Sequence, residues 1–102
     1  ELIVSIQLVK NTDFIEYRQL SVVNSDEPPA VFSGKNTLGV HSECVGEHAV
    51  GAGNLLANED VPAKMVEIFH SCEGTLAERL LIALQAGLDA GGEAGEVHSA
   101  VF

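Results

Sequence analysis

A chain of 102 residues is at most one domain, and its 46% hydrophobic residues supply enough apolar surface to exclude a disordered chain. Fifteen acidic against five basic residues give a formal net charge of −10, which repels phosphate backbones, so we expect no nucleic-acid partner. Two cysteines, Cys44 and Cys72, are too few for a disulfide framework. We therefore expect a reducing compartment and a cytoplasmic location, although one disulfide between them remains compatible with the sequence.

The first half of the chain is predicted to be mostly β-structure. Residues 1–9 are apolar over too short a distance to span a bilayer, so no membrane partner is expected, and without a decisive period they fit a helix or a strand. The alternation in "YRQLSVV" predicts a strand with Gln19 and Leu20 on opposite faces. The turn formers of "NSDEPP" then predict a hairpin that returns through "AVFSG". A further single strand, broken by Gly46, is predicted through "CVGEHAVGAG".

The second half changes to a helical period. Apolar spacing in "EDVPAKMVEIFHSC" predicts a helix that Asp60 caps, with Pro62 in its first turn and Gly74 at its end. The letters "TLAE" predict a capping box at Thr75. Behind it an apolar stripe repeats every four residues: Leu76, Leu80, Leu84 and Leu88. With a last strand at residues 96–102, the predicted fold class is α+β, with both helices covering one face of an antiparallel sheet.

The stretch "HSECVGEH" raises the question of a zinc site. Its His41, Cys44 and His48 would share one face only on a helix, where thiolate and imidazole suit zinc. The glycines at Gly46 and Gly51 oppose a helix, because each costs about 1 kcal/mol relative to alanine. On a strand the three side chains do not converge, so we predict no metal ion, and no cofactor.

A second candidate site lies around the glycine-spaced run "GAGN". It lacks the third glycine and the Lys-Ser or Lys-Thr pair of a phosphate loop. Asn54 carries a donor and an acceptor and could hold a substrate amide or an oxyanion, although the simpler interpretation is a turn or a cap. Spacing does not decide whether His98 is a packed residue or a pocket residue. The chain contains no Gly-x-Ser-x-Gly elbow and no HExxH motif.

Four stretches together, "YRQLSVVN", "VFSG", "GEHAVGAGNLLAN" and "LAERLLIALQAGLDAGGEAGEVHSA", resemble a known family. It is the bacterial and archaeal domain of unknown function 1028, grouped with the N-terminal-nucleophile (Ntn) hydrolases, and the resemblance is to its C-terminal half. It implies part of an αββα sandwich, a single domain or fragment over residues 1–102, with a substrate site between two sheets. It also makes Asn54 with Gly53, and then His48 and His98, the candidate substrate-lining residues.

The resemblance further implies amide hydrolysis. In Ntn hydrolases an N-terminal Thr, Ser or Cys attacks an amide carbonyl, and its own α-amino group acts as the base. Residue 1 is glutamate, so the nucleophile is expected outside this chain, on a missing N-terminal half or a companion chain. The implied substrate is a small amide or a peptidoglycan-related molecule. The alternative is a non-catalytic small-molecule-binding or assembly protein on the same scaffold.

Two features of this sequence bear on partners and ligands. From Glu93 to Glu96 the chain departs from the basic residues of similar proteins, and His98 stands where glutamine is common. Loss of those cations would alter binding of an anionic substrate. A partial sandwich would leave one sheet face and its strand edges uncovered, so we expect a homo-oligomer or a complementing chain.

Overall fold

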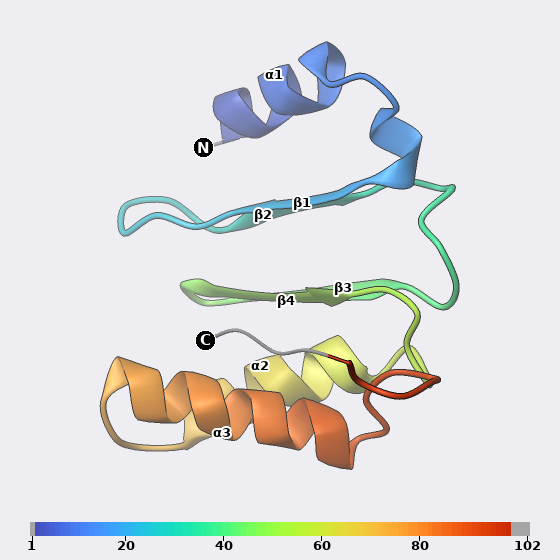
Figure 1. Ribbon diagram of the computed structural model, residues 1–102. Helices are drawn as coiled ribbons and strands as arrows, with labels where there is room; N and C mark the ends of the chain where they lie inside the picture. Colours follow the sequence, from blue (N-terminus) through green and yellow to red (C-terminus); the bar gives the residue numbers. More distant parts are fainter. Residues whose placement is uncertain (1, 99–102) are drawn as a thin grey trace.

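The structure, a computed structural model, describes the backbone of residues 2–98 and the side chains of residues 7–98. Its layers follow the order helix, sheet, sheet, helices (Figure 1). The elements are α1 (Leu2–Asn11), a 3-10 turn η1 (Ile15–Tyr17), β1 (Gln19–Val22), β2 (Ala30–Ser33), β3 (Ser42–Gly46), β4 (Ala49–Gly53), α2 (Val61–Ser71) and α3 (Leu76–Asp89). The α+β class predicted from the sequence is therefore confirmed, with two small antiparallel sheets in place of one.

The first hairpin forms as the sequence predicts. Strands β1 and β2 are antiparallel, with Gln19 opposite Ser33 and Leu20 opposite Phe32. Their turn is organised by Asn24, whose side-chain oxygen accepts hydrogen bonds from two following backbone N–H groups at 2.9 Å. The strand begins at Gln19, two residues later than predicted, because Ile15–Tyr17 form η1.

The prediction of one strand through "CVGEHAVGAG" is wrong. The segment is a second hairpin, in which β3 and β4 pair antiparallel and the two-residue turn Glu47–His48 is closed by the pair Gly46 and Ala49. His48 takes a left-handed conformation with φ of 57°. Histidine tolerates this region better than most residues, but the turn lacks the Asn-Gly or Asp-Gly signal that marks a hairpin in a sequence.

Helix α2 packs closely against the second hairpin because two strand residues that face it are glycines. A Cβ atom at Gly51 would lie 2.9 Å from the Pro62 carbonyl oxygen and 3.1 Å from Val66 Cγ2. A Cβ atom at Gly46 would lie 2.6 Å from Val66 Cγ1. The distances of 2.9 and 2.6 Å are shorter than real Cβ contacts allow, so larger residues at these positions would push α2 away.

The ends of α2 differ from the prediction in two details. Asp60 is the N-cap residue, but its side chain makes no capping hydrogen bond. Instead, the Asn58 side chain accepts from the Asp60 backbone N–H at 2.9 Å. Pro62 lies in the first turn as predicted, whereas the helix ends at Ser71, before Gly74. Cys72 is the C-cap residue there, and its N–H donates to the carbonyl of Ile68.

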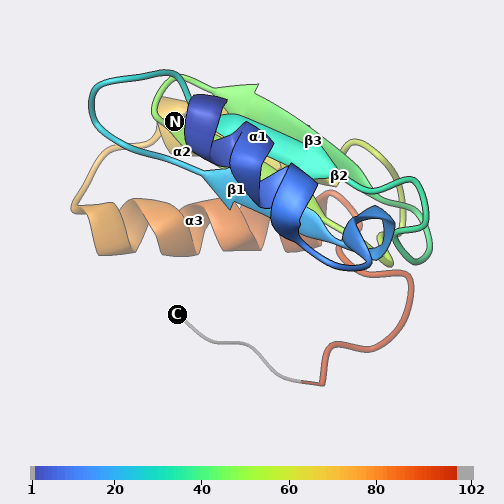
Figure 2. The same ribbon diagram turned by 90° about the horizontal axis from the view of Figure 1, so that it is seen from above.

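Helix α3 begins at the predicted cap, where the Thr75 hydroxyl accepts from the backbone N–H of Glu78 at 3.2 Å. It packs on α2 through buried Ala83 and Gly87, and the absence of a side chain at Gly87 leaves room for Met65. The leucine stripe is largely uncovered: Leu76 is 63%, Leu80 42%, Leu84 45% and Leu88 57% exposed. The expectation that both helices cover one sheet face is therefore wrong for α3, which extends beyond the sheets in the view of Figure 2.

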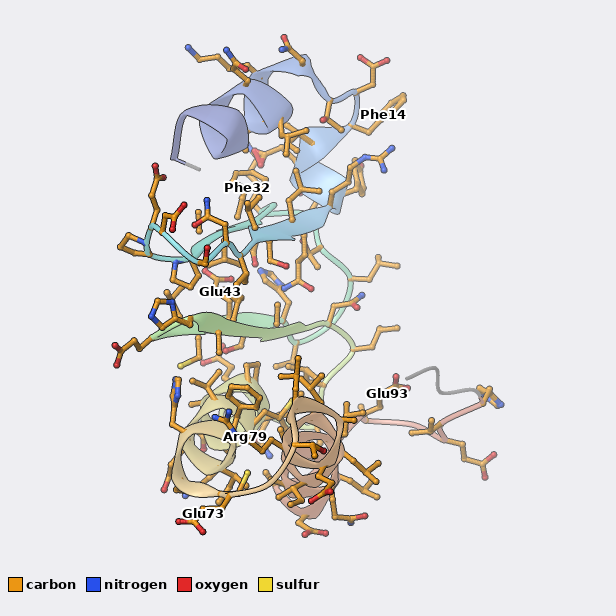
Figure 3. The ribbon with its side chains drawn as sticks, turned by 90° about the vertical axis from the view of Figure 1, so that its left-hand side faces the viewer. Phe14, Phe32, Glu43, Glu73, Arg79 and Glu93 are labelled. Carbon is orange, nitrogen blue, oxygen red and sulfur yellow. The ribbon has the colours of Figure 1, made fainter. Side chains whose placement is uncertain are left out.

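Arg79 of α3 connects this helix to α2 through contacts with Phe69. The Arg79 guanidinium lies 4.1 Å from the centre of the Phe69 ring and donates two hydrogen bonds to the Phe69 carbonyl oxygen, from Nε at 3.3 Å and Nη2 at 2.9 Å. Figure 3 shows Arg79 between the two helices. The positive charge also lies near the C-terminal end of α2, where the helix dipole favours a cation.

The ambiguous opening run is helix α1, which lies over the β1–β2 hairpin with Phe32 on the sheet face between them (Figure 3). The strand predicted at residues 96–102 is absent at residues 96–98, and its remainder lies outside the described residues. Within residues 2–98, no helix combines the length and the apolar character needed to cross a membrane.

Replacing Gly51 with valine should separate α2 from β4. The added methyl groups meet the Pro62 carbonyl and Val66, so we expect the free energy of unfolding to fall by about 1–3 kcal/mol in urea denaturation. The matched control is Gly95→Ala, because no atom lies within 4 Å of a Cβ there, and it should change stability by less than about 0.5 kcal/mol. Equal losses in both variants would contradict this account of the packing.

Candidate functional site

Polar side chains meet between the two sheets at the end where the β2–β3 and β4–α2 connections lie (Figure 1). Gln19 Nε2 donates to Ser33 Oγ at 3.0 Å and to the Gly53 carbonyl oxygen at 3.1 Å. The Ser33 hydroxyl in turn donates to a carboxylate oxygen of Glu43. We call Gln19, Ser33 and Glu43 the intersheet cluster. With the Gly53 carbonyl it links all four strands of the two hairpins, and Figure 3 shows Glu43 in the layer between them.

Strand periodicity explains why these residues share one layer. In β1 and β2, Leu20 and Phe32 face α1, so the opposite pair, Gln19 and Ser33, faces the second hairpin. In β3, Gly46 faces α2, so Glu43, an odd number of positions away, faces the first hairpin. The register of each hairpin then brings the side chains to the same end of both sheets.

The chemistry of the intersheet cluster is that of a hydrogen-bonding surface with one negative charge. The Glu43 side chain is exposed, and the hydrogen bond from Ser33 engages one of its carboxylate oxygens. The second oxygen is an acceptor for which the described residues supply no hydrogen bond. Gln19 and Ser33 hold the carboxylate in place, so the arrangement can accept a hydrogen bond from an amide N–H or an ammonium group.

The four residues predicted to line a substrate site fall into separate places. Gly53 ends β4, where its carbonyl accepts from Gln19, and exposed Asn54 follows directly. His48 lies in the turn at the opposite end of β4, beyond Ala49. His98 is exposed and lies beyond α3. The structure thus brings Gly53 to the intersheet cluster, with Asn54 next to it in the chain, and separates the two histidines from it, while the role of all four stays a prediction.

His48 lines a different feature, an apolar cleft of about 610 Å³. The cleft lies between β4 and the two C-terminal helices, and we call it the β4–α3 cleft. Its lining comes from β4 and its turn, from α2, from α3 and from the end of β1: Val23, His48, Ala49, Val50, Gly51, Met65, Val66, Phe69, Leu76, Leu80, Ala83 and Leu84. His48 is the one titratable residue in that set, so the cleft suits an apolar occupant.

The histidines and cysteines of the second hairpin lie apart. His41 precedes β3, Cys44 lies within it and His48 is in the turn beyond it. In residues 7–98, no three metal-ligating side chains come together in a way that could hold an ion. Cys44 and Cys72 are both free thiols.

Comparison with known proteins places the chain in a family. The model of a family described as "Family of unknown function (DUF1028)" matches residues 3–102. The chain belongs to this family. The crystal structure of protein SPO2555 from Silicibacter pomeroyi, also assigned to DUF1028, superposes with a TM-score of 0.77 at 28% sequence identity. The match covers 84% of this chain but only 38% of that one, and none of the curated proteins searched matches the chain.

Sequence reasoning did not single out the intersheet cluster. The alternation of β1 did place Gln19 opposite the apolar Leu20, and this polar position on a strand was the available signal. The sequence does not reveal that the two hairpins stack. This stacking brings Glu43 to Ser33, which lies 10 residues earlier in the chain. A contact between two sheets produces no periodic pattern of apolar and polar residues in the sequence, so periodicity cannot predict it.

Replacing Gln19 with alanine should loosen the two sheets at this end of the DUF1028 chain. The Gly53 carbonyl and Ser33 hydroxyl lose a part-buried partner, so we expect the free energy of unfolding to fall by about 1–2 kcal/mol. Gln85→Ala is the control, because its exposed side chain bonds only to Asp89 on the same helix and should be nearly neutral. Denaturation in urea measures both, and a neutral Gln19→Ala would show that the cluster does not join the sheets.

Proposed function

We propose that this DUF1028 chain is part of an Ntn-type hydrolase that cleaves an amide bond in a small molecule or a peptidoglycan-related substrate. The observation that carries the proposal is the hydrogen-bonded cluster of Gln19, Ser33 and Glu43 between two sheets stacked face to face with helices outside. That is the layer in which an αββα hydrolase of this kind would bind its substrate. The 38% coverage of the Silicibacter protein supports a larger catalytic domain of which this chain is one section.

The proposed chemistry uses a nucleophile from the part of the DUF1028 domain outside this chain. The hydroxyl or thiol of an N-terminal Thr, Ser or Cys adds to the substrate carbonyl carbon, and the terminal amino group takes its proton. That proton passes to the amide nitrogen as the C–N bond breaks and the amine leaves. Water then adds to the acyl-enzyme and gives a proton back to the nucleophile, and the carboxylic acid is released. No metal ion enters these steps.

The residues of this chain would bind and orient the substrate. The free acceptor oxygen of Glu43, held by Ser33, would take a hydrogen bond from an N–H group of the substrate. Asn54 at the same end of the sheets offers both a donor and an acceptor for a second polar group. Proper orientation of the amide against the nucleophile lowers the barrier by removing the entropy of positioning from the chemical step.

The proposal includes a cytoplasmic location, supported by the two free thiols of Cys44 and Cys72. The alternative of a non-catalytic binding protein is favoured by the apolar lining of the β4–α3 cleft, which has the character of a ligand pocket. The two functions make different predictions, since only the hydrolase releases an amine from a bound amide.

A chimera tests the hydrolase. This chain replaces the matching section of the SPO2555 protein, and the product is incubated with a panel of small amides and peptidoglycan fragments. We expect amine release, followed by mass spectrometry, from the chimera and from intact SPO2555 protein, and none from this chain alone. Glu43→Gln in the chimera should lower kcat/KM about tenfold or more, because the substrate loses a charged acceptor.

The matched control is Glu73→Gln, since Glu73 is an exposed carboxylate in the connection between α2 and α3, away from the intersheet layer. It should leave kcat/KM unchanged. Saturable binding of an amide by both proteins without any turnover would contradict the hydrolase and assign the scaffold to the binding class.

A further inference from the structure

The surface around the β4–α3 cleft has the composition of a core from which one layer is missing. Six large apolar residues of α3 are more than 40% exposed: Leu76, Leu80, Leu81, Ile82, Leu84 and Leu88. Monomeric proteins rarely expose apolar groups contiguously on this scale without a partner. Three of these leucines, Leu76, Leu80 and Leu84, line the cleft, and we call them the leucine face of α3.

The cleft opens along the edge of a sheet. Its strand lining is Ala49, Val50 and Gly51 of β4, and no residue of β3 takes part. Among the described residues β4 pairs only with β3, so the other edge of β4 presents unpaired backbone N–H and C=O groups. The neighbouring surface is the leucine face of α3, which lies beyond the sheets on this side (Figure 2). An added strand could therefore form backbone hydrogen bonds with β4 and pack its apolar side chains against the leucines of α3.

We propose that the open edge of β4 and the leucine face of α3 are the docking surface for a β-strand from the part of the DUF1028 domain that lies outside this chain. The inference rests on the proposed function in taking this chain as a section of a larger domain. It goes further by naming the strand edge, the helix face and the chemistry of the segment. That segment pairs with the five residues of β4 and presents alternate apolar side chains to Leu80 and Leu84.

The length of the relative identifies the occupant. The Silicibacter protein matches 84% of this chain, yet the match is only 38% of its own length, so most of that protein lies outside the common section. A second copy of this chain fits the surface less well. Each copy has a formal net charge of −10, so pairing two copies would bring like net charges together.

Association of separate pieces tests the docking. The probe is the portion of the SPO2555 protein outside the matched section, co-expressed with this chain and purified through a tag on the probe. We expect a one-to-one complex and slower hydrogen exchange than in this chain alone at the backbone amides of Val50 and Ala52, the β4 residues whose N–H groups point away from β3 in this register. Leu84→Glu should weaken the complex about tenfold or more, because a carboxylate would be buried without a partner. Leu38→Glu is the control, since Leu38 is 65% exposed and lies outside the cleft.

Each outcome decides the proposal. A complex that Leu84→Glu disrupts and Leu38→Glu leaves intact supports it. Absence of a complex, or equal binding by both variants, overturns it. The proposal is also overturned if this chain forms a homodimer that Leu84→Glu dissociates, because the surface would then bind a second copy. The chimera tests the hydrolase separately. A complex that forms while the chimera releases no amine contradicts only the hydrolase. Amine release by the chimera, with a complex that does not depend on Leu84, contradicts only the docking.

Discussion

Close approach of α2 to the second hairpin is the constraint on which the arrangement of this protein depends. Gly46 and Gly51 lie at strand positions that face the helix, and Val66 fills the space that their missing side chains leave. Side chains alternate along a strand, so when a glycine such as Gly46 faces α2, residues an odd number of positions away face the first hairpin. Glu43 is one of these residues. The packing of a helix on one face thus fixes which residues stand between the sheets on the other.

Local signals in the sequence predicted those elements whose structure is decided locally. The first hairpin follows from alternation and from the turn chemistry of Asn24, and α3 begins where the hydroxyl of Thr75 offers a cap. The sequence does not predict the second hairpin, because its turn depends on a left-handed histidine, His48, instead of a glycine. The period of the leucines predicts the helix, but amphipathicity does not tell what covers the apolar face.

The candidate site was less predictable than the fold for a physical reason. The intersheet cluster forms where two hairpins stack, and stacking is governed by shape and burial over residues far apart in the sequence. The sequence points to Gly53 because glycine in a strand marks close approach, and to Asn54 for its donor and acceptor; in the structure the Gly53 carbonyl accepts from Gln19, while the role of both residues stays a prediction. His48 is predicted to share their site, but the chain reverses at His48, which therefore lies at the end of β4 opposite Gly53.

The exposed leucines of α3 also have a consequence for the abundance of this protein in a cell. A chain whose apolar face is open to water is a target for chaperones and proteases until that face is covered. Under the proposed docking, covered molecules would persist and uncovered ones would be removed, so the steady amount of the chain would follow the supply of its partner as well as its own rate of synthesis.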